Sequence, residues 1–140
     1  MPRIDHRTAM KGVRFRARAI LTSQRRTLVH IDRPGVAADG LRVDEDGGLW
    51  VALWGGAAVS RYGPDGSLLA NVPIPAERPT SCAFGGPELA TLFVTTARTD
   101  LDEVALADQP DAGRVFAIDG LGVRGLPCVP FRGQHQQMGV

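Results

Sequence analysis

The chain has 140 residues, of which 16 are Lys or Arg and 15 are Asp or Glu, so its net charge at neutral pH is +1. A charge balance this even excludes a protein that is held to nucleic acid or to an anionic membrane by its overall charge. The length, together with a hydrophobic content of 44%, fits one globular domain or a piece of a larger one.

The first 22 residues form a basic segment. Eight of the 16 bases lie within residues 1–26, where Asp5 is the sole acid. Apolar residues alternate with arginines from Val13 to Ala19, which favours an edge strand within a basic surface segment; an organelle transit peptide and a poorly folded remnant are the alternatives. No apolar run reaches the roughly 20 residues of a membrane span or forms a signal-peptide core, so we expect a cytoplasmic protein.

From residue 27 onward, short β-rich runs alternate with turns. The run 27–31 ends in Asp-Arg-Pro-Gly, an Asp-Gly pair joins the next two runs, and GPDG at 63–66 precedes the last. No helical period of useful length appears, so the predicted class is all-β. The four runs predicted to form one antiparallel sheet are GLRV (40–43), LWVAL (49–53), AVSRY (58–62) and SLLANVPI (67–74).

This four-strand unit repeats about 41 residues later. ADGLRVD (38–44) aligns with PTSCAFG (79–85), and LWVA (49–52) aligns with LFVT (92–95). A repeat near 40 residues is typical of propeller blades. The second unit continues through RVFAI (114–118) and a fourth run, GVRGLP (122–127), after an acidic insertion at 98–113 that reads as a surface loop.

Two repeats and part of a third cannot close a ring of blades. The sequence therefore predicts the C-terminal portion of a larger propeller. Its outer blade faces would carry exposed apolar strands, which predicts self-association through those faces.

The quoted motifs, from Ser23 to Gly133, resemble the regucalcin/gluconolactonase family, also called senescence marker protein-like. The resemblance implies a six-bladed propeller of about twice this length, of which the chain holds about two C-terminal blades plus part of a third. It divides the chain into a basic segment (1–22), a propeller portion (23–133) and a C-terminal tail (134–140). It also implies a divalent-metal-dependent lactonase acting on sugar lactones or related esters.

The resemblance assigns the chemistry to Asp39. In the family, the acid of a PDG motif begins the innermost strand of a blade, where it is a metal ligand and the catalytic acid/base. Here the motif is ADG, with Ala38 in place of proline. The implied metal is calcium first, with zinc, manganese or magnesium as alternatives, because hard divalent ions prefer carboxylate and amide oxygens.

The remaining family ligands are absent from this chain. They are a glutamate from the first blade and an asparagine one blade earlier, whereas Asn71, the one asparagine here, is predicted in an outer strand. A lone carboxylate holds such an ion weakly. We therefore expect Asp39 to be a ligand without its partners.

Other candidate residues have competing interpretations. Thr80 and Ser81 align with the ADG motif and would line the substrate pocket or serve packing. Asp44–Asp46 resembles the start of a calcium loop, although later ligands are missing and a solvated hairpin turn is favoured. Trp50 and Trp54 suit blade packing better than a sugar platform.

Nucleophilic chemistry has little support in the sequence. No G-x-S-x-G elbow is present, and the three histidines, His6, His30 and His135, lie in a tail, an outer strand and a tail. Cys82 and Cys128 are isolated and are predicted to be reduced structural thiols.

Three functions remain open at this point. The chain is a lactonase-type hydrolase, a non-catalytic partial propeller without its metal cage, or a truncated gene fragment. The expected partners are a small lactone and other copies of the chain, with neither nucleic acid nor membrane among them.

Overall fold

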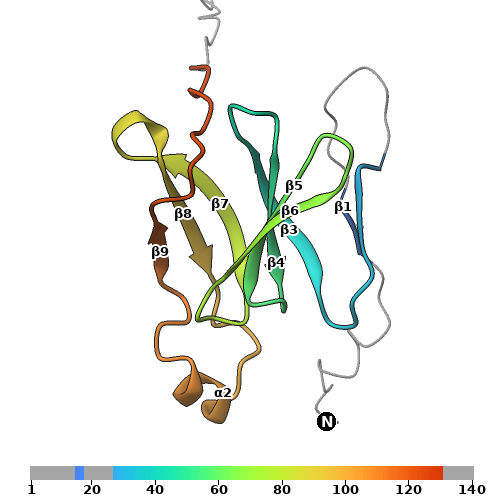
Figure 1. Ribbon diagram of the computed structural model, residues 1–140. Helices are drawn as coiled ribbons and strands as arrows, with labels where there is room; N and C mark the ends of the chain where they lie inside the picture. The colour runs from blue at the N-terminus through green and yellow to red at the C-terminus, as the bar shows by residue number, and fades with distance from the viewer. Residues whose placement is uncertain (1–14, 18–26, 131–140) are drawn as a thin grey trace, which may run out of the picture.

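The computed structural model describes residues 15–17 and 27–130, which form three antiparallel sheets lying side by side (Figure 1). Outside the described residues lie most of the predicted basic segment (1–22), the C-terminal tail (134–140) and two of the histidines, His6 and His135. The strands are β1 (Phe15–Ala17), β2 (Val29–Ile31), β3 (Ala37–Val43), β4 (Leu49–Trp54), β5 (Ala58–Tyr62), β6 (Leu68–Pro73), β7 (Pro79–Gly85), β8 (Thr91–Thr96) and β9 (Val115–Ile118).

The first complete sheet has the order β3-β4-β5-β6. It is the four-stranded unit predicted at 38–74, and tight turns join its strands, with Gly47 and Gly66 in the left-handed region at φ of 80° and 87°. Asn71 lies in the outermost strand, β6, as predicted, where its Oδ1 accepts a hydrogen bond from Ser60 Oγ at 2.7 Å. The all-β class and the antiparallel blade are confirmed.

The second sheet has the order β7-β8-β9 and ends there. The predicted fourth strand at 122–127 is wrong: the chain leaves the sheet after β9, and Gly120 and Gly122 turn it with φ of 74° and 72°. Gly125 instead forms an isolated bridge with Asp44, on the turn of the first sheet. The last segment thus ties the two sheets together and leaves the outer edge of β9 without a neighbouring strand among the described residues.

The insertion predicted as a loop contains a short helix, α2 (Glu103–Asp108). Asp102 caps it by accepting a hydrogen bond from the Ala105 amide at 2.9 Å. Six residues are too few to show a helical period in sequence. A single 3-10 turn, η1 (Pro87–Leu89), precedes β8, and within the described ranges no helix is long and apolar enough to cross a membrane.

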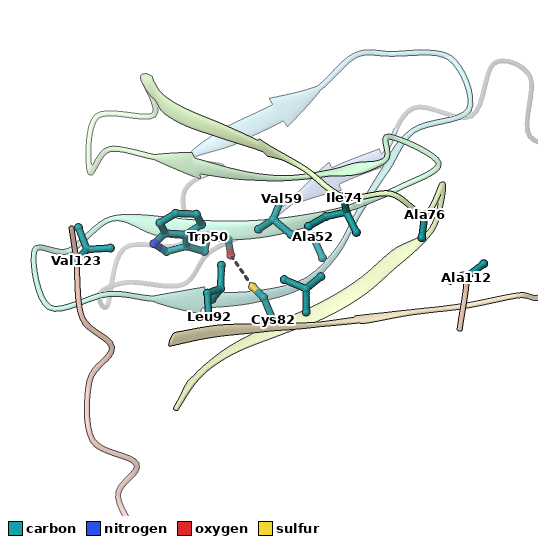
Figure 2. Close-up of a cluster of buried hydrophobic side chains, with 10 residues drawn as sticks. Trp50, Ala52, Val59, Ile74, Ala76, Cys82, Leu92, Ala112 and Val123 are labelled. Carbon is teal, nitrogen blue, oxygen red and sulfur yellow. Dashed lines mark hydrogen bonds between the residues drawn. The ribbon is translucent and has the colours of Figure 1, made fainter. Parts of the chain in front are cut away.

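The main core lies between the two larger sheets, where alternate residues of each strand meet (Figure 2). Trp50, Ala52 and Val59 of the first sheet face Cys82 and Leu92 of the second. The Trp50 ring meets the Phe84 ring edge to face at 5.9 Å, so this tryptophan packs between blades as predicted.

A second core covers the opposite face of the first sheet. Val29 and Ile31 of β2 pack there against Leu49, Val51 and Leu53 of β4. β4 lies between the two cores, and its residues belong to both. Burial on both faces explains why LWVAL is apolar at every position.

Candidate functional site

The first strands of the two larger sheets, β3 and β7, lie beside each other, and each gains one residue against its neighbouring strand. In β3 the register against β4 shifts between Ala38 and Leu41, and in β7 the register against β8 shifts between Pro79 and Ser81. The bulge of β3 holds Asp39 and Gly40 opposite Ala52, and the bulge of β7 holds Thr80. Asp39 and Thr80 are at repeat-equivalent positions, 41 residues apart. Bulges of this kind re-aim a side chain at the end of a strand.

Asp39 lies inside β3, at this bulge, although the sequence suggested a place just ahead of the strand. Its side chain is exposed and makes no hydrogen bond or ion pair to the other described residues. The carboxylate is therefore available for a ligand or a reacting group at the bulge of β3.

The close approach of β3 to β7 explains why the third residue of the ADG motif, Gly40, is a glycine. A Cβ atom added to Gly40 would lie 2.3 Å from Ser81 Oγ and 2.7 Å from Ser81 Cα. The backbone of β3 therefore meets β7 at van der Waals contact, next to Asp39. This contact brings the two predicted site segments, 38–40 and 79–81, together.

We expect Gly40→Ala to destabilise the chain by about 1–3 kcal/mol, because the new methyl group overpacks this contact. Urea unfolding would measure the loss. Gly40→Ala combined with Ser81→Gly removes two of the three colliding atoms and should recover part of the stability. If Gly40→Ala leaves the free energy of unfolding unchanged, β3 and β7 are not held this close.

Of the two predicted pocket residues, Thr80 has a hydroxyl group that is hydrogen-bonded within its own sheet. Thr80 Oγ1 and Thr95 Oγ1 are hydrogen-bonded at 2.6 Å, which closes the bulge of β7 onto β8. Ser81 is exposed and lies against Gly40. Their role in a substrate pocket stays a prediction.

A divalent cation does not fit the described residues alone. Among residues 15–17 and 27–130, no group of three or more His, Cys, Asp and Glu side chains lies close enough to hold a metal ion. Asp39 and the neighbouring hydroxyls offer one negative charge, whereas calcium takes six to eight oxygens.

Asp44 lies in a buried network, and its predicted place in a solvated turn is wrong. The residue is 1% exposed, and its carboxylate accepts hydrogen bonds from Arg61 Nε at 2.7 Å, Trp50 Nε1 at 2.8 Å and the Gly48 amide at 2.8 Å. Burial by itself would raise the pKa of Asp44, but the bonds from Arg61, Trp50 and Gly48 outweigh it and lower the pKa. The turn acid therefore anchors the β3–β4 hairpin and is not a calcium ligand.

Arg78 was not singled out in the sequence, yet it joins three parts of the molecule just before β7. Its guanidinium lies 5.1 Å over the Trp54 ring, and it donates hydrogen bonds to the backbone carbonyls of Thr99 and Asp100 in the insertion. The insertion is thus held at the same end of the sheets as Asp39 and Thr80. The one feature of the sequence that could have drawn attention to Arg78 is its position, directly before Pro79, the first residue of β7.

The two cysteines differ in environment, and both are free thiols. Burial raises the pKa of Cys82 to about 12, and its Sγ lies 3.8 Å from the Trp50 carbonyl (Figure 2). Cys128 is exposed and accepts a hydrogen bond from Arg42 Nη2 at 2.9 Å. Both cysteines were predicted to be structural thiols, but only Cys82 is buried in the core.

The sequence matches a known family. A family model described as the SMP-30/Gluconolactonase/LRE-like region matches residues 10–98. Regucalcin of Sus scrofa is 42% identical over 112 residues, which are 79% of this chain and 38% of that protein. Regucalcin of Danio rerio is 43% identical over the same shares.

Two solved structures are similar in fold and sequence. A calcium-binding protein, regucalcin, from Agrobacterium tumefaciens matches with a TM-score of 0.68 and 34% identity, over 75% of this chain and 35% of that one. A luciferin-regenerating enzyme matches with a TM-score of 0.55 and 34% identity, over 69% and 36%. The chain therefore spans little more than a third of the length of these relatives.

Proposed function

The chain belongs to the SMP-30/gluconolactonase/LRE-like family, and we propose that it is a carboxylate-bearing part of a lactone-hydrolysing propeller. Its substrates would be sugar lactones or related esters. Since the matched region is 38% of a regucalcin, the remaining blades of an active ring have to come from outside these 140 residues.

One observation supports this proposal above the others. Asp39 stands exposed at a bulge of the innermost strand, and Gly40 brings that strand against the next sheet. A carboxylate at this position can take a proton from water as it attacks a lactone carbonyl, and can return it to the leaving oxygen.

We propose calcium as the metal of the completed site, with zinc, manganese or magnesium as alternatives. Support comes from a relative described as a calcium-binding regucalcin. A bound divalent ion would polarise the lactone carbonyl. Within this chain Asp39 would be its ligand, and the other ligands would come with the missing blades.

The proposal is tested by supplying those blades. We propose that the matched 38% of a regucalcin is its C-terminal part. The remaining N-terminal portion would be coexpressed with this chain and the complex purified. Hydrolysis of gluconolactone with calcium, zinc or manganese is then measured. A stable complex with no hydrolysis under any of these ions would refute the proposed function.

A second function is a non-catalytic partial propeller. It is supported by the finding that residues 15–17 and 27–130 contain no group of three or more His, Cys, Asp and Glu side chains that could hold a metal ion. We therefore expect the purified chain alone to bind calcium only at millimolar concentration or weaker, and to show little lactone turnover. Calorimetric titration beside a lactone assay measures both. Tight stoichiometric binding with Asp39-dependent hydrolysis would show that the chain completes the site by itself.

We further propose that the protein works in the cytoplasm on a small lactone, without nucleic acid or membrane as a partner. The two free thiols, Cys82 and Cys128, and the even charge support this setting.

A further inference from the structure

The insertion between β8 and β9 leaves the second sheet at the end where β3 and β7 begin. In each larger sheet the first residue of the first strand pairs with the last residue of the second strand: Ala37 with Trp54, and Pro79 with Thr96. Figure 1 shows α2, which belongs to the insertion, beyond this end of β8. Asp39 is two residues after Ala37, so its carboxylate and the insertion lie at the same end of the molecule.

Arg78 fixes the first residues of the insertion. Its guanidinium donates hydrogen bonds to the Thr99 carbonyl and, at 3.1 Å, to the Asp100 carbonyl. Its Nη1 also lies 3.6 Å from Asp100 Oδ2, and its own carbonyl accepts a hydrogen bond from the Ala97 amide at 2.9 Å. The Arg78 side chain is only 12% exposed, and a charge so far removed from water needs acceptors of this kind.

The same arginine ties the insertion to the strand next to β3. The guanidinium carbon of Arg78 lies 5.1 Å from the centre of the Trp54 ring. A planar guanidinium can lie over an aromatic ring while its N–H groups bond carbonyls, and lysine lacks this fork. Because Trp54 pairs with the first residue of β3, Arg78 joins the insertion to the strand that carries Asp39.

Asp100 has a backbone conformation that the arginine supports. Its φ is 57°, in the left-handed region that residues other than glycine adopt infrequently. Its carbonyl and its carboxylate both contact Arg78, yet its side chain is 45% exposed, and the neighbouring Thr99 is exposed as well. Such a conformation, maintained by surrounding contacts, is characteristic of residues that serve a site.

The far end of the insertion is fixed too. Gln109 Oε1 accepts a hydrogen bond from the Glu77 amide. Thr96 Oγ1 accepts one from the Gly113 amide at 3.0 Å and donates one to the Arg114 carbonyl at 2.7 Å. Both ends of the insertion are therefore bonded to the strands or to the residues just before them, which gives the segment a defined position.

We propose that Arg78 is a positioning residue for substrate binding. It holds Thr99 and Asp100 at the rim of the site, where their side chains contact the hydroxyl groups of a sugar lactone whose carbonyl is at Asp39. The reaction is the lactone hydrolysis proposed above, on which this inference rests. A carboxylate and a hydroxyl are suitable partners for sugar hydroxyls, and loops on a rigid scaffold commonly carry such contacts. The rim would favour polyhydroxylated lactones over unsubstituted ones.

Steady-state kinetics of the complex with the N-terminal portion of a regucalcin tests this, with gluconolactone and with γ-butyrolactone, which has no hydroxyl group. Arg78→Ala should raise KM for gluconolactone about tenfold and change kcat less than about threefold, because Asp39 is untouched. For γ-butyrolactone, kcat/KM should change less than about threefold. Arg78→Lys should not restore KM, since an ammonium group does not reproduce the guanidinium fork.

Arg114→Ala is the matched control. The Arg114 side chain is 74% exposed and pairs with Asp111 inside the insertion at 3.0 Å, so the variant removes an arginine without releasing the insertion from the sheets. Its kinetics should equal those of the unmodified complex.

Asp100→Gly tests the rim without touching the arginine. Glycine adopts a φ of 57° freely, so this variant removes the carboxylate and keeps the backbone. It should raise KM for gluconolactone as Arg78→Ala does. In the 140-residue chain alone, hydrogen exchange over the insertion should accelerate in Arg78→Ala and stay unchanged in Asp100→Gly, and circular dichroism shows that each variant is folded.

The outcomes separate this inference from the proposed function. A wild-type complex that hydrolyses no lactone refutes both. An active complex in which neither Arg78→Ala nor Asp100→Gly raises KM for gluconolactone overturns the inference alone. An equal loss for both lactones in both variants overturns it as well, because the rim would then serve only the fold.

Discussion

Asp39→Ala is expected to abolish lactone hydrolysis in the propeller completed with the N-terminal portion of a regucalcin. Loss of a positioned acid/base costs about a hundredfold to ten-thousandfold in rate, and loss of a metal ligand adds to this. Asp39→Asn keeps an oxygen at the bulge, so it should retain part of the metal binding while losing proton transfer. Steady-state kinetics and calcium titration on the same complex separate the two effects.

Glu45→Gln is the matched control for this experiment. Glu45 is an exposed acid just beyond the other end of β3, so the variant removes one negative charge without touching the bulge. Its kinetics should equal those of the unmodified complex. Full activity of Asp39→Asn would show that another group moves the proton.

Asp44→Ala is expected to lower the free energy of unfolding by about 3 kcal/mol or more, since breaking a buried pair leaves its partners unpaired. Arg61 Nε, Trp50 Nε1 and the Gly48 amide all lose their acceptor. Urea denaturation of the purified chain, at one fixed protein concentration, measures the loss.

Asp46→Ala is its control. Asp46 lies 3.4 Å from Arg61 Nη2, but its side chain is 64% exposed, so the change should stay within about 1 kcal/mol. A comparable loss in both variants would place the stabilisation in the charge of the turn rather than in the buried network.

The pH dependence of this stability follows from the lowered pKa of Asp44. A carboxyl with a lowered folded-state pKa stabilises the fold above its unfolded pKa of about 3.9, and this contribution is lost as pH falls toward the folded-state value. The stability gap between wild type and Asp44→Asn should therefore be full near pH 6 and shrink below about pH 4.

The sequence by itself determined the four strands of the first sheet, the three strands of the second, their order and the family. Each run from GLRV to SLLANVPI carries its own turn residues, and a hairpin forms from local geometry and alternation without help from distant parts of the chain. The 41-residue repeat then placed Asp39 and Thr80 at equivalent positions, because repeated units fold alike.

Only the tertiary structure decided which polar residues are buried and where the last segment lies. In the sequence, Asp44 has the pattern of a solvated turn acid. Its burial depends on Arg61 and Trp50, whose side chains donate hydrogen bonds to it in the folded chain. The segment after β9 crosses to the first sheet because Gly120 and Gly122 turn it there, a choice of direction that alternating residues do not encode. Contacts between segments distant in sequence depend on the packing of whole sheets, and local patterns carry no record of that packing.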